Sequence, residues 1–275
     1  MSAYETLLSR TEDGIGFLTL NRPDKRNAMN PKLHAEMNLA LDEMIGDESV
    51  RVIILTGAGE SFSPGNDLKE FFTEQMDNPV EFRRASLAFA QWREKLRNSP
   101  KPTIAAVNGW CLGGGLSVIC VMDFAIAADE AKFGLPEINF GMFPAGGATK
   151  GPLELLSHRD VLDLALTGRN MDAAEAERLR LINRRVPRER LMEECVALAN
   201  ELKKKDPLAL MIAKEAFWRD KELSFPAALD FEAGKMRELN FLQKGQWVSE
   251  GIQKFLQKKY KPSETSYTQV PERKD

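Results

Sequence analysis

The sequence is poor in the residues that mark disulfide scaffolds, metal centres and nucleophilic triads. Its 275 residues include three cysteines, two histidines and three tyrosines. Cys111, Cys120 and Cys195 form no CxxC pair and are odd in number, which disfavours a disulfide framework and a zinc site. Because His34 and His158 lie in no recognisable catalytic motif, a Ser-His-Asp mechanism is disfavoured and no metal site is predicted.

Long apolar runs and a large excess of either charge are also missing. The 38 basic residues are interspersed with 41 acidic ones, so the net charge is −3 and no basic footprint for nucleic acid is present. The apolar run 115–122 ends at Asp123, well short of a membrane span. The N-terminus shows no basic segment followed by an apolar one. We therefore expect a cytoplasmic protein without a nucleic-acid or membrane partner.

Strand and helix patterns alternate along the first half of the chain. Short apolar runs predict strands at 16–20, 52–56, 102–107, 124–128 and 132–134. Apolar residues at helical spacing predict helices at 31–44 and 85–96, the first of them capped by Asn30. Beyond about residue 145 the strand signals fade and helical patterns dominate. These patterns predict an α/β core followed by an all-helical part.

We place the core at residues 1–200, the helical region at 201–260 and a mobile tail at 261–275. The helical region carries more large apolar side chains than a peripheral helix needs. They predict either a subunit interface or an intramolecular core. These side chains are Phe231, Met236, Leu239, Phe241, Trp247 and Phe255.

The most informative stretch is NGWCLGGG (108–115), in which three glycines precede a predicted helix at 114–122. Glycine is unfavourable in regular structure, so a triplet at this place needs a physical reason. Either it lets helix and strand pack closely, or its bare N–H groups at a helix N-terminus stabilise negative charge. The stretch is not a P-loop, because Leu116 and Ser117 follow the last glycine, and it does not contain GxGxxG.

Four motifs occur in order along the chain: NRPDKRNAM (21–29), SPGNDLKE (63–70), KPTIAAVNG (101–109) and FGLPEINFG (133–141). Together they resemble the crotonase (enoyl-CoA hydratase/isomerase) superfamily from about residue 14 to residue 255. Within it, NGWCLGGG with Ser117 and PEINFG is most similar to the hydroxycinnamoyl-CoA hydratase-lyases. The resemblance implies a spiral of ββα turns and a C-terminal helical region that builds a homotrimer or a dimer of trimers.

The resemblance also implies a chemistry for the glycine stretch. The backbone N–H groups of Asn66 and Gly114 match the two donors that bind the thioester oxygen of an acyl-CoA. Hydratases of the best-known type use two glutamates, and this chain keeps Glu137 at one position but has Ser117 at the other. Both are candidate catalytic residues. The alternatives are a turn residue for Glu137 and, for Ser117, a helix hydroxyl bonded back to a carbonyl.

Further positions follow from the same resemblance. Lys25, Arg26, Ala28 and Lys69 match the residues that hold CoA, although Lys25 and Arg26 also suit solvated surface charges. Phe71, Trp110 and Phe140 are expected to line the acyl pocket. Hydroxycinnamoyl enzymes recognise the substrate phenol through tyrosines, but Phe71 occupies one of those positions here. An acyl group without a phenol is therefore expected.

The leading hypothesis is hydration of an α,β-unsaturated acyl-CoA, aromatic or bulky, with or without retro-aldol cleavage. No cofactor is expected, since CoA is part of the substrate. A double-bond isomerase is an alternative, because one carboxylate suffices to move a proton between Cα and Cγ. An inactive CoA-thioester-binding structural subunit is another, since it would not need Glu137.

Overall fold

The computed structural model describes residues 4–74 and 77–269 of the chain. Two compact units are present. The core unit comprises the residues up to Ser99 together with Thr103–Ala197, and the C-terminal unit comprises Pro100–Pro102 and the residues from Leu198 onward. Within the described ranges, no helix has the length and apolar character needed to cross a membrane.

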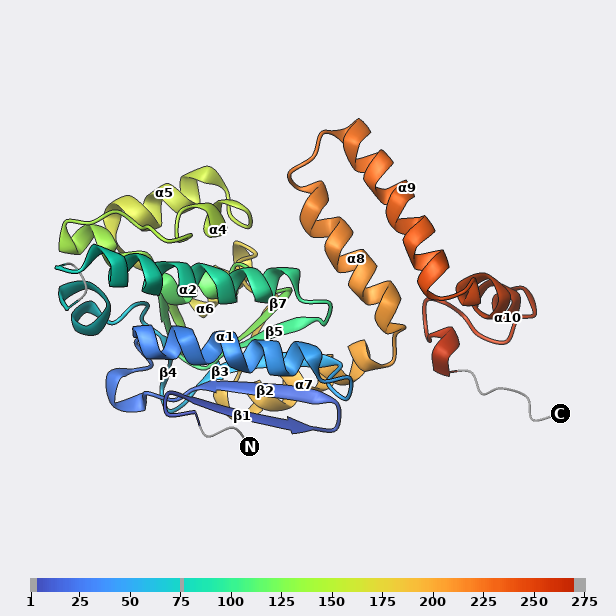
Figure 1. Ribbon diagram of the computed structural model, residues 1–275, viewed down its shortest axis with the longest axis horizontal. Helices are drawn as coiled ribbons and strands as arrows, with labels where there is room; N and C mark the ends of the chain where they lie inside the picture. The colour runs from blue at the N-terminus through green and yellow to red at the C-terminus, as the bar shows by residue number, and fades with distance from the viewer. Residues whose placement is uncertain (1–3, 75–76, 270–275) are drawn as a thin grey trace. The chain divides into compact units, whose positions relative to one another are not determined.

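A six-stranded sheet forms the centre of the core unit (Figure 1). Its strands in spatial order are β1 (Leu7–Glu12), β2 (Ile15–Leu20), β3 (Val52–Gly57), β5 (Thr103–Val107), β7 (Phe124–Ala128) and β10 (Arg184–Val186). The β1–β2 pair is antiparallel, and the other neighbouring pairs are parallel. β5 is buried along its whole length, as its unbroken apolar sequence predicts for a strand covered on both faces.

A second sheet of four short strands lies in the same unit. In spatial order these are β4 (Ser61–Ser63), β6 (Trp110–Leu112), β8 (Lys132–Gly134) and β9 (Asn170–Asp172). The chain enters the second sheet three times, each time shortly after a strand of the main sheet: β4 follows β3, β6 follows β5 and β8 follows β7. After each such pair of strands, the chain continues through helical segments. The predicted α/β spiral of ββα turns is therefore confirmed.

Helices cover the main sheet. α1 (Pro31–Gly46) and α2 (Pro79–Asn98) lie side by side (Figure 1). The predicted cap of α1 is present, since Asn30 Oδ1 accepts a hydrogen bond from the Leu33 N–H at 2.9 Å. The other α-helices of this unit are α3 (Gly114–Ile119), α4 (Lys150–Leu153), α5 (His158–Thr167) and α6 (Ala173–Arg178), and α7 (Leu191–Lys203) contains the unit boundary.

Several strands escape the sequence analysis. β9 and β10 lie beyond residue 145, where strands were not expected, and no strand was predicted for the segments that form β4 and β6. Each of these four strands has three residues, which is too short to show a period of two. β1 is missed because four of its six residues, SRTE, are polar. It pairs with β2 at the sheet edge, where one strand face meets solvent.

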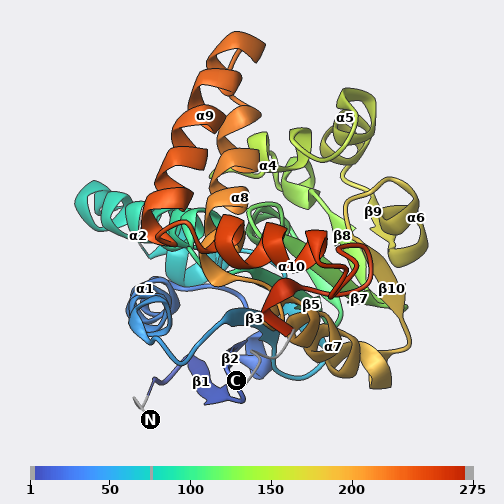
Figure 2. The same ribbon diagram turned by 90° about the vertical axis from the view of Figure 1, so that its right-hand side faces the viewer.

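The C-terminal unit is helical. α8 (Pro207–Asp220) and α9 (Phe225–Leu242) lie side by side (Figure 2), followed by the π-helix η5 (Trp247–Ile252) and α10 (Gln253–Leu256). Large apolar side chains on α8 and α9 are exposed, including Phe217 at 77% and Phe241 at 81%. The expected tail is described as far as residue 269, where Tyr267 donates a hydrogen bond to Asp206 Oδ2 at 3.1 Å. Residues 270–275 lie outside the described residues.

Candidate active site

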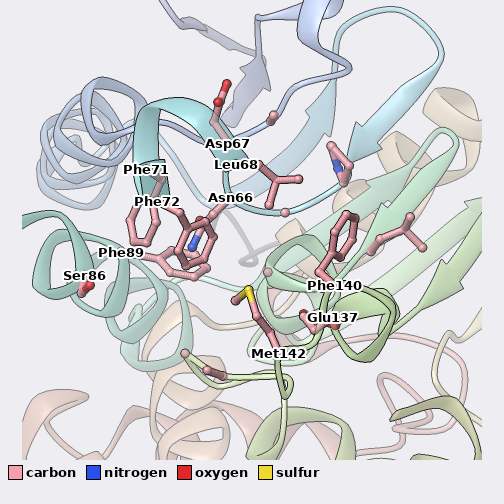
Figure 3. A pocket seen from close by; sticks show the side chains of 18 of the residues that line it. Asn66, Asp67, Leu68, Phe71, Phe72, Ser86, Phe89, Glu137, Phe140 and Met142 are labelled. Atoms are coloured by element: carbon pink, nitrogen blue, oxygen red, sulfur yellow. The ribbon is translucent and has the colours of Figure 1, made fainter. Parts of the chain in front are cut away.

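A cavity of about 850 Å³ lies within the core unit (Figure 3). Segments 64–72, 112–114 and 136–146 line it together with helix α2 and the turn that precedes α1. Most of the residues that the sequence singles out meet here. They are Lys25, Ala28, Asn66, Lys69, Phe71, Gly114, Glu137 and Phe140.

Two glycine-containing turns approach each other closely in the cavity wall. A Cβ on Gly65 would lie 2.9 Å from the Gly114 nitrogen, and Gly65 has a φ of +103°. Gly113 has a φ of +50°, and a Cβ there would lie 2.6 Å from Glu137 Oε1. A larger residue at Gly65 would be strained and would press against the Gly114 backbone, and one at Gly113 would be strained and would displace the Glu137 carboxyl. The sequence left close packing and exposure of N–H groups as alternative reasons for the glycines, and the structure shows the close packing directly.

The N–H groups of Asn66 and Gly114 face no acceptor within the described chain. Asn66 forms an isolated β-bridge with Met29. The bridge consists of two hydrogen bonds, from the Met29 N–H to the Gly65 carbonyl and from the Asp67 N–H to the Met29 carbonyl. The Asn66 N–H takes part in neither bond. Gly114 is the first residue of α3, where backbone N–H groups have no intrahelical partner. Two backbone donors are therefore available at the cavity wall.

Glu137 is positioned over this turn by the 3₁₀-helix η3 (Pro136–Phe140). Its Oε2 is buried and has no hydrogen-bond partner among the described residues. Burial raises the pKa of this carboxyl, and the only opposing cause is a bond to its own backbone N–H. In Figure 3, Glu137 lies near Phe140 and Met142, across the cavity from Phe71, Phe72 and Phe89. A half-buried carboxyl with a raised pKa is suited to move a proton.

Ser117 is fully buried on α3 and is not among the residues that line the cavity. Its Oγ donates to the Gly114 carbonyl at 2.7 Å and accepts from Arg93 Nη1 at 3.2 Å. The hydroxyl thus bonds back to its own helix, as one of the two sequence interpretations proposed. The bond from Arg93 of α2, a cavity residue, was not anticipated.

Comparison with known proteins agrees with this geometry. Residues 10–265 match the family model described as enoyl-CoA hydratase/isomerase. The chain belongs to the enoyl-CoA hydratase/isomerase (crotonase) family. It is 40% identical to a hydroxycinnamoyl-CoA hydratase-lyase from Pseudomonas fluorescens, over 97% of this chain and 99% of the relative. It is 39% identical to a probable enoyl-CoA hydratase from Rhizobium meliloti (strain 1021), over 94% of this chain and 97% of that relative.

A solved structure shows the same fold. The enoyl-CoA hydratase subunit I from Geobacillus kaustophilus HTA426 has a TM-score of 0.85 and 35% identity, covering 94% of this chain and 97% of that one. The protein is therefore a crotonase-superfamily enzyme of the enoyl-CoA hydratase/lyase type.

In this crotonase, the segments that carry the expected CoA contacts are joined by a buried ion-pair network. Arg22 pairs with Asp67 at 3.1 Å and with Glu70, and its Nη1 donates to the Ala28 carbonyl at 2.6 Å. Although burial acts to raise the pKa of Asp67, hydrogen bonds from the Glu70 N–H and from Arg22 hold it below its usual value. This network was not predicted from the sequence. The only local indication of it is the spacing of Asp67 and Glu70, which resembles a capping box at a helix start.

A buried histidine supports the aromatic side of the cavity and was also missed. His34 Nδ1 accepts a hydrogen bond from Trp92 Nε1 at 3.1 Å, and its ring stacks on Phe89 at 4.7 Å between centroids. Burial lowers the pKa of His34 to about 3, and the nearby Asn66 side chain opposes the shift. His34 Nε2 and Asn66 Oδ1 are both buried without a partner of ordinary hydrogen-bond geometry. His34 is thus a neutral packing residue directly behind Asn66.

Besides Ser117, two predicted site residues do not line the cavity. Trp110 is on β6, 39% exposed, and is not part of the cavity lining, because its strand neighbour Cys111 takes the buried face. Arg26 is exposed at the end of η1 (Pro23–Lys25) and does not line the cavity either. The prediction that Trp110 lines the acyl pocket is therefore corrected. Phe71, by contrast, is buried in the wall, and Phe140 is exposed at its edge.

Proposed function

We propose that the enzyme hydrates an α,β-unsaturated acyl-CoA, with Glu137 as general acid and base. The observation that carries this proposal is the buried, unpartnered carboxyl oxygen of Glu137 beside two backbone N–H groups that have no acceptor in the described chain. Such donors suit the oxygen of a thioester, on which negative charge develops during addition to the double bond. No cofactor beyond the CoA of the substrate is proposed.

The proposed reaction has two proton steps. Glu137 takes a proton from water as the water oxygen bonds to Cβ, and the electrons of the double bond move onto the thioester oxygen. The N–H groups of Asn66 and Gly114 hold this oxyanion. Glu137 then gives the proton to Cα, and the thioester carbonyl forms again. The raised pKa of Glu137 suits it to hold the proton between the two steps.

We assign Ser117 a positioning role within this scheme. Its hydroxyl donates to the Gly114 carbonyl and accepts from Arg93, so it steadies the first turn of α3 beside the Gly114 donor. Lys25, Ala28 and Lys69 line the cavity and are proposed to hold the CoA portion, with Arg26 available at the adjacent surface.

The acyl group is proposed to be large or aromatic. Phenylalanines line much of the cavity, and no tyrosine is among the residues described as lining it. Retro-aldol cleavage of a phenolic substrate draws on a hydrogen-bonded phenol, so hydration without cleavage is favoured here. The lining phenylalanines are Phe71, Phe72, Phe82, Phe89, Phe140 and Phe143.

A substrate panel tests the proposal. Purified enzyme is assayed with crotonyl-CoA, cinnamoyl-CoA, feruloyl-CoA and a 3-enoyl-CoA, and the products are separated by chromatography. We expect 3-hydroxyacyl-CoA products from the 2-enoyl substrates. Conversion of the 3-enoyl substrate alone would favour the isomerase, and binding without turnover across the panel would favour a structural subunit.

We also propose that the C-terminal helices assemble three chains, or two such trimers. The exposed aromatic side chains of α8 and α9, among them Phe217, Phe225 and Phe241, support an apolar interface between copies. Sedimentation equilibrium should give a mass of three or six chains. A monomer at micromolar concentration would contradict the proposal.

A further inference from the structure

Arg93 is a cation in the cavity wall without a carboxylate partner. Its Nε donates to the Phe89 carbonyl at 3.4 Å, its Nη1 donates to Ser117 Oγ at 3.2 Å, and its guanidinium lies 4.1 Å from the centre of the Phe89 ring. Each of these partners is neutral. Among the described residues, no aspartate or glutamate forms an ion pair with Arg93, and Nη2 has no acceptor.

This arrangement differs from that of Lys69, which also lines the cavity. Lys69 is 81% exposed and lies 3.7 Å from Glu74, so its charge is solvated and paired. Burial lowers the pKa of Arg93 to about 10, and the group still carries its charge at neutral pH. A largely buried charge without a counter-ion is unfavourable unless something else completes its environment.

The guanidinium packs closely against the backbone of Gly147. A Cβ on Gly147 would lie 2.0 Å from Arg93 Nη1, so only bare backbone fits against it, and Gly147 has a φ of +93°. The Phe89 ring also contacts the guanidinium by a cation–π interaction. The guanidinium is therefore closely packed by Gly147 and Phe89, while its Nη2 has no acceptor among the described residues.

Glu137 does not supply the missing charge. Burial raises the pKa of Glu137, a bond to its own backbone N–H opposes the rise, and no neighbouring cation contributes. The carboxyl and the guanidinium line one cavity as two separate groups. The first stays available for proton transfer and the second for binding.

We propose that Arg93 binds a carboxylate carried by the acyl part of the substrate, so that the enzyme acts on CoA thioesters of dicarboxylic acids. The assignment rests on the proposed function for the reaction, and it adds the charge class of the acyl group. A planar guanidinium matches a carboxylate by two parallel hydrogen bonds, and in a low-dielectric cavity such a bond is strong. The CoA phosphates are suited instead to exposed cations such as Lys69.

Binding of saturated thioesters tests the assignment without turnover. Succinyl-, glutaryl- and adipyl-CoA are each compared by calorimetry with the corresponding methyl ester, which has the same CoA but a neutral acyl end. For the acid of matching length, we expect at least tenfold tighter binding than for its ester. Arg93→Met should bring that ratio close to one, and Arg93→Lys should lower it several-fold, because lysine cannot form the bidentate pair.

Arg84→Met is the matched control, since Arg84 lies on the same helix, is exposed and does not line the cavity. It should keep the full acid preference. Circular dichroism and melting temperature establish that each variant is folded, and Arg93→Lys decides the matter if Arg93→Met does not fold. Equal binding of all three acids and their esters by the wild type would overturn the assignment. An acid preference that survives intact in Arg93→Met or Arg93→Lys would overturn it too.

The outcome is separable from that of the hydration assay. If no enoyl-CoA is hydrated but an acid preference depends on Arg93, the proposed reaction is wrong and the carboxylate site stands. If hydration occurs without any acid preference, the reaction stands and Arg93 has only its structural contacts to Ser117 and Phe89.

Discussion

Two walls of the same cavity are built from different parts of the chain. The turn wall, defined as residues 64–66, 112–114 and Glu137, offers backbone N–H groups, glycines and one carboxyl. The helix wall, defined as the cavity residues of α2, offers side chains: Phe82, Ser86, Phe89, Ala90 and Arg93. A backbone N–H group is kept when most side chains are substituted. The shape and charge of the helix wall, by contrast, change with every substitution of its side chains. The proposed function therefore assigns the common chemistry to the turn wall and the choice of acyl group to the helix wall.

The largest effect is expected at the carboxyl of the turn wall. Glu137→Gln keeps the shape of the side chain but removes its ability to exchange a proton, so kcat should fall roughly 10²–10⁴-fold. The loss should be similar for every acyl-CoA that the wild type hydrates. Steady-state kinetics with two substrates of different acyl size checks this.

The pH profile of the wild type gives an independent reading of Glu137. A base must be unprotonated to act, and burial raises the pKa of this carboxyl, so the acid limb of kcat/KM should lie above the usual glutamate value.

Two outcomes of the Glu137→Gln experiment would show that the turn wall does not hold the common chemistry. One is a wild-type rate in the variant, and the other is a loss confined to one substrate.

The next largest effect tests the close packing of the turn wall. In Gly113→Ala, the new methyl group would meet Glu137 Oε1 at 2.6 Å in a backbone conformation that disfavours side chains. Displacing a reacting group by about 1 Å costs about 10²-fold. We expect that loss in kcat with a smaller change in KM, measured in the same assay.

Gly59→Ala is the matched control for Gly113→Ala. Gly59 also has a positive φ, of +71°, but a Cβ there meets only Pro23 at an ordinary 3.4 Å. It should lower stability slightly and leave kcat nearly unchanged. If both variants lose activity equally, backbone strain and not contact with Glu137 explains the loss.

The glycine part of the turn wall could be located from the sequence because consecutive glycines are unusual in regular structure, whereas Asn66 and Glu137 were predicted through the family resemblance. Three glycines at 113–115 and a proline before Glu137 are visible without coordinates. The longer strands and helices were predictable for a similar reason, since apolar periodicity extends over many residues, as in α1.

The helix wall could not be predicted in this way. In the sequence, Arg93 cannot be told from the other charged residues of an amphipathic helix. Its contact with Ser117, 24 residues away along the chain, arises only in the folded protein. His34 and Trp92 are 58 residues apart, and their contact has no local signal either. Trp110 was expected in the acyl pocket, but side chains alternate along β6, so Cys111 takes the buried face and Trp110 the exposed one.

Another prediction concerns His34, which lies behind the helix wall. Burial lowers the pKa of His34 to about 3, so the folded protein keeps it neutral, while the unfolded chain takes up a proton below about pH 6.5. Above that pH, His34 is neutral in both states and does not change the free energy of unfolding with pH. Between about pH 6.5 and 3, it should lower the free energy of unfolding by about 1.4 kcal/mol per pH unit.

Urea unfolding of wild type and His34→Gln, from pH 7.5 to 5, measures this contribution. Other groups titrate in both proteins, so the difference between the two curves isolates His34. We expect the wild type to lose more stability than the variant as the pH falls. Parallel curves would mean that His34 accepts a proton in the folded state.

The smallest effect is expected where the two walls meet, at Ser117. Its hydroxyl links the Gly114 carbonyl to Arg93, and losing such a bond costs about 0.5–1.5 kcal/mol, so Ser117→Ala should lower kcat by about tenfold at most. The acid limb of the pH profile should not move, since Glu137 still carries the proton. Ser86→Ala is the control, because Ser86 also bonds back to its own helix, at Phe82, but does not contact the glycine turn. A loss near that of Glu137→Gln, with a shifted pH profile, would instead make Ser117 a proton carrier and place part of the chemistry at the junction with the helix wall.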